Sequence, residues 1–384
     1  TMANVLTNLA ADIYVAADVV GRELVGFIPA STINANGSER VAKGDTVRAS
    51  FTRAATAVDV SESMTVPEGT DQTVDNKTLS ITKSRAVQIP YTGEDVRHLN
   101  NGIGFETVYG DQIAQAMRTL CNEVETDLAV EAYTNASRAH GTAGTTPFGT
   151  NNHAIAEMRK ILVDNGMPTE QDQVSLILSS SAGANLRKLA ALQEVNKSGN
   201  DTLLRQGILL DLFGMGIRES AQIQSHTKGT ATGLDANGGE PVGETSIVLD
   251  GGDGGTLLAG DVVTFAGDSN KYVVNTGFTA AAGTAVLGSP GLQAALATTT
   301  EMTIGDSFSA NIAMHRRALE LAIRAPAVPE GGDLADDSLI VQDQRSGLVF
   351  EVRVYRGYRK SMIEVGVAWG VKAWKPDFIA TLLG

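Results

Sequence analysis

FETVYGDQIAQAMRTLCNEVETDLAVEAYTNASR, residues 105–138, is the stretch that decides how the rest of this chain is arranged. Apolar side chains recur along it at steps of three and four, at Val108, Ile113, Met117, Leu120/Cys121, Val124, Leu128 and Ala132. Charged residues mostly fill the other faces, so the pattern predicts one amphipathic helix. At about 1.5 Å per residue this helix is roughly 50 Å long, well beyond an average globular helix. We therefore expect a spine to which the other parts attach.

Two segments before this helix carry patterns of their own. Residues 3–28 show a second helical stripe, which Pro29 ends and which needs some other surface to cover it. Residues 46–90 contain two alternating runs, separated by the polar, turn-rich stretch Val66–Lys77, and predict a long two-stranded ribbon. Isolated ribbons are marginal in water, so we expect this one to lie on a neighbouring subunit.

The chain beyond the long helix predicts an α+β arrangement. We expect a helix at 152–164, a buried strand at 174–178 and a helix at 181–192. The serines at 179–181 would cap the second of these helices. Residues 203–215 are apolar and interrupted by glycines, and their pattern indicates neither a helix nor a strand.

Residues 227–300 differ sharply in composition and are rich in Gly, Thr, Ala and Asp. Their short β runs predict a small all-β insertion. A helix is expected at 309–324, where apolar and basic residues are in helical register, before Pro326. The strands that follow are expected at 339–341, 348–355 and 362–374.

The net charge and the cysteine content limit the classes of function that this chain can have. The net charge of the 384 residues is −14, and Lys or Arg never run longer than a pair, which argues against DNA binding as the main task. The single cysteine, Cys121, cannot form a disulfide within the chain, and we expect it to be buried and inert. No apolar run approaches a membrane span and no signal peptide is recognisable, so we expect synthesis and assembly in a cytoplasm.

Motifs for catalysis are missing. The phosphate-binding loop, the dinucleotide fingerprint and the nucleophile elbow do not occur, and the five histidines lack ligand spacing. The DGGDGG run at 250–255 is expected to be a tight turn and not a calcium repeat. The carboxylate pairs Glu123/Asp127 and Asp127/Glu131 are expected on a solvated or inter-subunit face. We predict no catalytic, cofactor-binding or metal-binding residue, and no enzyme.

Four stretches resemble a known family and occur in its order. They are residues 3–29 (ANVLTNLAADIY…FIP), 66–95 (VPEGTDQTVDNKTLSITKSRAVQIPYTGED), 311–332 (NIAMHRRALELAIRAPAVPEGG) and 346–378 (SGLVFEVRVYRGY…WGVKAWKPDF). They resemble coat proteins of tailed bacteriophages with the Hong Kong 97-like capsid fold, in the subfamily of short-tailed lambdoid phages. Residues 257–267 (LLAGDVVTFAG) resemble the start of that subfamily's β insertion domain.

The resemblance implies an order of domains. It gives an N-terminal arm (1–35), an extended loop with peripheral-domain strands (36–95), the spine helix of the peripheral domain (96–140), the first part of the axial domain (141–226), an inserted β-module (227–300), and an axial and peripheral return (301–384).

The resemblance also implies a function. The chain would self-assemble into hexamers and pentamers of an icosahedral shell around double-stranded DNA, which it encloses without sequence-specific binding. Partners would be a separate scaffolding protein, a portal protein and, in some relatives, a decoration protein; no membrane is involved. The location would be the virion, after assembly in the host bacterial cytoplasm. The alternative is the shell subunit of an encapsulin-like compartment. A β-rich hydrolase and a cell-surface adhesin fit less well.

Individual residues can be nominated for assembly. Glu68, Asp71 and Asp75 in the loop, together with Lys77 and Arg85, are expected to contact neighbouring subunits and set their register. Lys77 beside Asn76 is the only candidate for the Lys–Asn cross-link of some relatives, but no matching acceptor motif is present. Gly102 and Gly104 before the spine helix are expected either to form a hinge or simply to make a turn.

Overall fold

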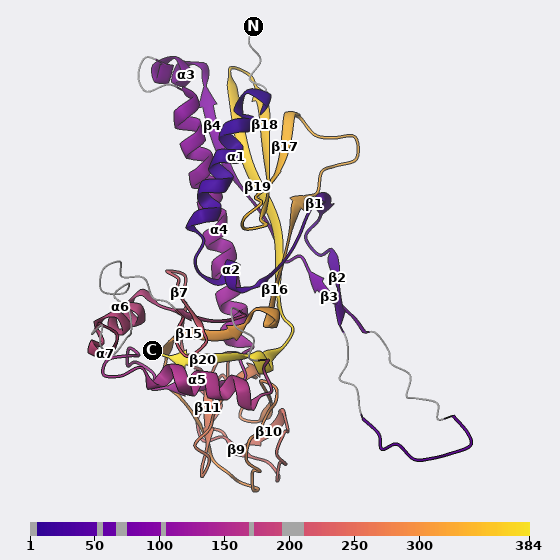
Figure 1. The fold of residues 1–384 in the computed structure, drawn as a ribbon, viewed down its shortest axis with the longest axis vertical. Helices are drawn as coiled ribbons and strands as arrows, with labels where there is room; N and C mark the ends of the chain where they lie inside the picture. Colours follow the sequence, from indigo (N-terminus) through magenta and orange to yellow (C-terminus); the bar gives the residue numbers. More distant parts are fainter. Residues whose placement is uncertain (1–5, 52–56, 67–74, 101–104, 169–172, 194–210) are drawn as a thin grey trace.

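The computed structural model describes residues 6–51, 57–66, 75–100, 105–168, 173–193 and 211–384. The molecule is elongated (Figure 1). A helix-covered sheet occupies one end, and a second sheet with a small β-rich lobe occupies the other. The long helix α4 (Phe105–Thr134) runs along the first end and reaches the second, as the sequence predicts for a spine.

Helix α1 (Leu6–Glu23) packs along α4 of the same chain. Its inner face is fully buried there, through Ile13, Ala16, Ala17 and Val20. The surface that covers the predicted stripe is therefore within the molecule, and no neighbour is needed for it. The helix also ends earlier than expected, because Pro29 lies inside a separate short helix, α2 (Phe27–Ala30). Proline is tolerated in a first helical turn, where its missing N–H would have no partner.

The first sheet is six-stranded. Its order is β1 (Thr32–Val41), β16 (Leu319–Pro326), β19 (Lys360–Ala373), β18 (Val349–Gly357) and β17 (Ala335–Gln342), with β4 (Lys83–Thr92) on the other side of β19. β1 runs parallel to β16, and the other pairs are antiparallel. Helix α3 (Gly93–Asn100) follows β4. Helices α1 and α4 cover one face, over a core that includes the fully buried Trp369 and Ile363.

The ribbon consists of β2 (Thr46–Phe51) and β3 (Asp75–Ser80), paired antiparallel from Thr46↔Ser80 to Phe51↔Asp75. Its root is anchored by Leu79 and Ile81, which are buried against the first sheet. The predicted second run is thus divided, because residues 83–92 form β4 in the body of the molecule.

The second sheet is built around β15 (Phe308–His315) and β20 (Ile379–Leu383), which lie side by side. Its other strands outside the β-rich lobe are β5 (Arg138–Gly141), β6 (Val174–Leu178), β7 (Gly216–Glu219) and β8 (Ser225–His226). The predicted helices are confirmed as α5 (His153–Asp164) and as α6 (Ser180–Lys188) followed by α7 (Ala190–Gln193). The Ser179 side chain caps α6 by accepting from the Ala182 N–H.

The β-rich lobe has its own hydrophobic core, which includes Phe265, Tyr272 and Leu287. Its strands are β9 (Asp235–Ala236), β10 (Ser246–Asp250), β11 (Val262–Phe265), β12 (Lys271–Thr276), β13 (Gly283–Leu287) and β14 (Met302–Ile304). The chain enters it after β8 and leaves it before β15, and these two strands are hydrogen-bonded to each other. We call this lobe the β-module; with β14 it spans residues 227–305, slightly more than the insertion at 227–300 expected from the sequence.

The expected helix at 309–324 is wrong. This stretch forms strands β15 and β16, separated by the short 3₁₀ helix η1 (Arg316–Ala318). A second 3₁₀ helix, η2 (Pro376–Phe378), precedes β20. Among the described helices, none combines the length and the apolar character needed to cross a membrane.

Candidate assembly surfaces

The described residues contain no group of three or more His, Cys, Asp or Glu side chains placed to hold a metal ion. Cys121 is buried on α4, and burial raises the pKa of its thiol to about 12. Two of the histidines whose side chains are described are buried, and one of these, His226, contacts the Asp261 carboxylate with Nε2 at 2.8 Å. Asp261 also accepts from the backbone N–H groups of Gly229 and Leu258, so this pair fixes the root of the β-module.

The carboxylates along α4 bind the chain's own first sheet. Glu123 pairs with Arg85 of β4 (3.0 Å), and Asp127 pairs with Lys83 (2.7 Å). Asp127 also accepts from the Trp369 indole N–H (2.8 Å). Glu131 accepts from a backbone N–H of β19. These groups attach the helix to the sheet of the same chain, while Glu123 and Asp127 stay partly exposed to solvent.

The pattern places the charged residues of the long helix mostly on its other faces, but Glu125, one of these residues, is only 5% exposed. Its carboxylate accepts from the backbone N–H groups of Phe27 (3.0 Å) and Ile28 (2.9 Å). It also accepts from the Ser220 hydroxyl (3.0 Å). A Cβ on Gly26 would lie 2.4 Å from the same carboxylate, so only glycine fits there without a shift.

The nominated contact residues that the structure describes are not gathered in one place. Glu68 and Asp71, like the hinge candidates Gly102 and Gly104, lie outside the described residues. Asp75 begins β3. Lys77 lies further along β3, and its ammonium is 5.8 Å from the centre of the Trp374 ring. Arg85 is on β4, in the body of the molecule and not on the ribbon, where it is paired with Glu123.

Residues 57–66 form the described part of the ribbon's far end, which we call the tip segment. They lie away from the body of the molecule (Figure 1). Four large apolar side chains of one parity are almost completely exposed, namely Val58 (83%), Val60 (99%), Met64 (106%) and Val66 (86%). Soluble monomers rarely leave such a group uncovered, so it marks an interaction site.

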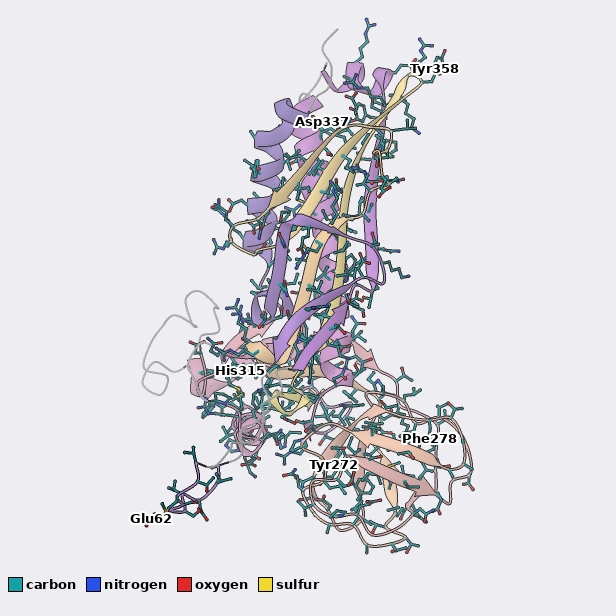
Figure 2. The ribbon with its side chains drawn as sticks, turned by 90° about the vertical axis from the view of Figure 1, so that its right-hand side faces the viewer. Glu62, Tyr272, Phe278, His315, Asp337 and Tyr358 are labelled. Atoms are coloured by element: carbon teal, nitrogen blue, oxygen red, sulfur yellow. The ribbon has the colours of Figure 1, made fainter. Side chains whose placement is uncertain are left out.

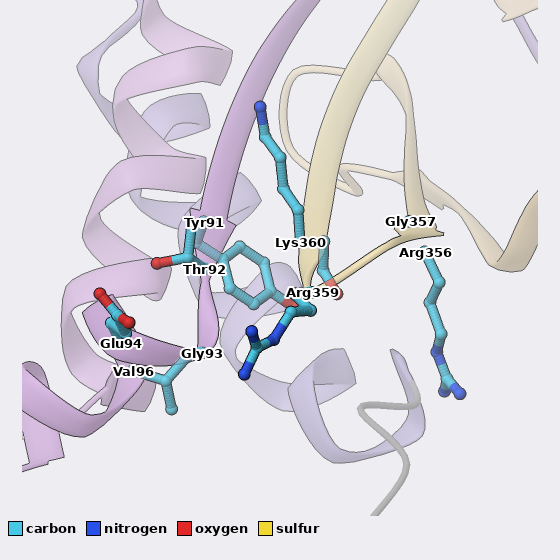
Figure 3. Close-up of a pocket in the computed structure, with 10 residues that line it drawn as sticks. Tyr91, Thr92, Gly93, Glu94, Val96, Arg356, Gly357, Arg359 and Lys360 are labelled. Carbon is cyan, nitrogen blue, oxygen red and sulfur yellow. The ribbon is translucent and has the colours of Figure 1, made fainter.

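A second exposed surface, which no sequence pattern predicted, lies at the turn between β18 and β19. Figure 3 shows the Tyr91 ring beside Arg359 and Lys360, with Arg356 across the turn. These residues, with the first residues of α3, line a groove of about 720 Å³. At the turn itself Tyr358 is 91% exposed. We call this surface the basic groove.

Of three comparisons with known proteins, only the one with solved structures found similar molecules. No protein-family model and no curated protein matches the sequence. Among solved structures, the capsid of cyanophage P-SCSP1u matches with 10% identity and a TM-score of 0.51, over 94% of this chain and 88% of that one. The mature capsid of bacteriophage PhiM1 matches with 10% identity and a TM-score of 0.47, over 94% and 87%. Mycobacterium phage Che8 gives 14% identity and a TM-score of 0.45, over 88% and 85%. From the cyanophage match and the element order, the chain has the fold of a phage capsid subunit.

Proposed function

We propose that this chain is the major capsid protein of a tailed bacteriophage. Copies of it would form the hexamers and pentamers of an icosahedral shell around packaged double-stranded DNA. The shared fold supports this proposal. The observation that carries it is the tip segment, because its apolar side chains have no cover in their own molecule and a neighbouring copy can supply one.

A shell subunit needs several modest interfaces with its neighbours, and an extended ribbon buries area on a neighbour without a core of its own. Contacts between unlike surfaces of identical copies close into rings when the rotation between copies allows it. The tip segment and the basic groove are two such unlike surfaces.

Negative-stain microscopy of the purified full chain tests the proposal. The expected result is closed particles with diameters on the order of tens of nanometres, the size reached when rings of this subunit close into a shell. A compact monomer at all concentrations, with its ribbon folded onto its own body, would contradict it. Packaged nucleic acid in particles from infected cells would separate a phage capsid from an encapsulin-like compartment.

The finer assignments belong to the same proposal. They are the Hong Kong 97-like fold of the short-tailed lambdoid phage subfamily, and the arm, extended loop, peripheral, axial and insertion domains within the boundaries given above. A separate scaffolding protein and a portal protein would be the assembly partners, with assembly in the host cytoplasm and final location in the virion. The order of helices and strands in the structure supports the proposed order of the domains.

Glu68, Asp71 and Asp75 are proposed to face basic residues of a neighbour. Reversing the charge of two of them should slow assembly while the far-ultraviolet circular dichroism of the monomer stays unchanged, because exposed ion pairs guide association more than they stabilise folding. Light scattering during assembly measures the rate. An unchanged rate would remove these residues from the interface, and Lys77 and Arg85 would remain as candidates.

Gly102 and Gly104 are proposed as a hinge that acts when the shell matures. Hydrogen exchange across residues 98–106, measured before and after expansion of the particle, distinguishes the hinge from a plain turn. Equal exchange in the two states would leave only the turn.

A further inference from the structure

Asparagine followed by glycine is chemically the least durable pair of residues in a protein. Glycine has no side chain to shield its backbone nitrogen, which can therefore attack the carboxamide carbon of the asparagine before it. This chain contains four such pairs, which begin at Asn36, Asn101, Asn165 and Asn237. Asn101 lies outside the described residues. The surroundings of the other three differ, so we expect them to react at different rates.

Hydrogen bonds hold Asn165 and Asn36 away from this reaction. The Asn165 carboxamide donates to the Asp377 carbonyl (2.7 Å) and accepts from the Arg138 guanidinium (2.8 Å). The Asn36 side-chain oxygen accepts from both the backbone N–H (3.0 Å) and the hydroxyl (2.7 Å) of Ser38. At either residue these bonds must break before the carboxamide can turn toward the following nitrogen.

Asn237 lies in the β-module, directly after β9, and is not held in this way. Figure 2 shows the β-module, where Tyr272 and Phe278 are labelled, as a lobe at one end of the molecule. The Asn237 side chain is exposed and forms no hydrogen bond with any residue that the structure describes. Within the same residues, the backbone N–H of Gly238 donates to no acceptor. A Cβ built on Gly238 would meet nothing within 4 Å, so a ring has room to close.

The backbone is fixed on both sides of this pair. The Asn237 N–H donates to the Val248 carbonyl of β10 (2.8 Å), and the Glu240 N–H donates to the Leu296 carbonyl (3.0 Å). The two residues between these anchors are both glycine, which adopts backbone conformations that other residues avoid. They can absorb a change in backbone length, so we expect the β-module to stay folded after the reaction.

We propose that Asn237 is a site of spontaneous deamidation in the native protein. The Gly238 nitrogen gives up its proton to the solvent and forms a bond to the carboxamide carbon of Asn237. The side-chain nitrogen takes up a proton from water and leaves as ammonia. Water then opens the resulting succinimide at either of its carbonyl carbons, which produces aspartate or isoaspartate. Each conversion adds one negative charge to the surface of the β-module, whether or not the chain forms a shell.

Incubation of the purified full chain at mildly alkaline pH tests this proposal. Peptide mass spectrometry measures aspartate and isoaspartate at each asparagine over time. Asn237 should convert at least about tenfold faster than Asn36 and Asn165, because those two must first lose hydrogen bonds. The same incubation in guanidinium chloride is the control. Unfolding removes the bonds, and the three residues should then convert at similar rates, since each precedes a glycine.

Asn237→Gln is the matched variant. Glutamine keeps an uncharged carboxamide at this exposed position but must close a larger ring, which forms much more slowly. Conversion at this position should therefore stop, while the rates at Asn36 and Asn165 stay unchanged. Anion-exchange chromatography of the incubated native protein should resolve a more acidic species from the wild type and none from the variant. Circular dichroism before and after incubation checks that the protein stays folded.

The comparison within one chain decides the outcome. Faster conversion at Asn237 than at Asn36 and Asn165 in the native protein, with the difference lost in guanidinium chloride, would establish the site. Equal native rates at the three residues would overturn the inference. An intact Asn237 in a native chain whose unfolded form converts would overturn it as well.

Discussion

Glu125 is a buried carboxylate whose hydrogen bonds join three separate parts of the chain. It lies on α4, accepts from the backbone at the start of α2, and accepts from Ser220 just after β7. Burying a charge is costly unless hydrogen bonds compensate for it, and these three donors do so. The segment between α1 and β1 is thereby held at a fixed point on α4.

Replacing this carboxylate should weaken the fold. Glu125→Ala leaves the buried N–H groups of Phe27 and Ile28 without an acceptor, and should lower the free energy of unfolding by about 2–4 kcal/mol. Urea unfolding followed by circular dichroism measures the change. Glu157→Ala, which removes a half-exposed carboxylate from α5, is the control and should change stability by less than about 0.5 kcal/mol. Equal effects of the two substitutions would contradict this role.

The Cys121 thiol should be unreactive in the native protein. Its raised pKa, about 12, keeps it protonated at pH 8, and only the thiolate reacts with disulfide reagents. One thiol per chain should therefore react after denaturation and almost none before. Rapid native labelling at pH 8 would show that α4 separates from its neighbours in solution.

The sequence predicted the burial of some individual residues and missed that of others. Cys121 was expected to be buried because it falls on the apolar stripe, and it is. The helical pattern placed the charged residues, Glu125 among them, mostly on the faces away from the apolar stripe, yet Glu125 is buried. Its partners, Phe27 and Ser220, are 98 and 95 residues away in the chain, and no local pattern shows such a contact.

The elements show which patterns carry structural information. The long helix could be predicted, since 30 residues repeat one apolar spacing. The strands β15 and β16 could not, because nearly all of their residues are buried on both faces. A strand of this kind reads as a continuous apolar run, which periodicity cannot distinguish from a buried helix.

The ribbon shows a second limit of the sequence pattern. Alternation continues from Leu79 to Ile89 without a change of parity, although the chain leaves the ribbon after Ser80 and joins the first sheet at Lys83. A change of strand partner leaves no mark on the alternation of side chains. The basic groove was missed for a similar reason, since β4, α3 and the β18–β19 turn meet there only in the folded chain.

Asp127 should be the strongest of the attachments between α4 and the first sheet. Asp127→Ala removes the acceptor of the buried Trp369 indole N–H. It should lower the free energy of unfolding by about 1–3 kcal/mol. Asp127→Asn keeps an oxygen for the indole and loses only the charge facing Lys83, so it should stay close to the wild type. Urea unfolding monitored by tryptophan fluorescence separates the two. Equal losses of stability in Asp127→Ala and Asp127→Asn would assign the effect to the ion pair with Lys83.

In the whole molecule, different parts provide the stability of the fold and the surface for assembly. Its two sheets and the β-module are filled by hydrophobic clusters, whereas the tip segment is exposed. Folding should therefore be independent of the tip segment, and shell formation should depend on it.

Shortening the ribbon tests this division. Residues 52–74 are replaced by Asn-Gly, which suits a two-residue turn between the paired ends Phe51 and Asp75. The shortened chain should unfold at the same urea concentration as the wild type but form no closed particles in negative-stain images. Normal particles would show that the tip segment is dispensable for assembly.

The β-module begins and ends on two strands that are hydrogen-bonded to each other, β8 and β15, through the pairs Phe308↔His226 and Ser309↔Ser225. A foreign domain whose own termini lie close together could be spliced in at this point with little disturbance to the chain on either side, provided that it also protects the edge of β5 now paired with β12. Recombination among related genes could exchange such a unit whole.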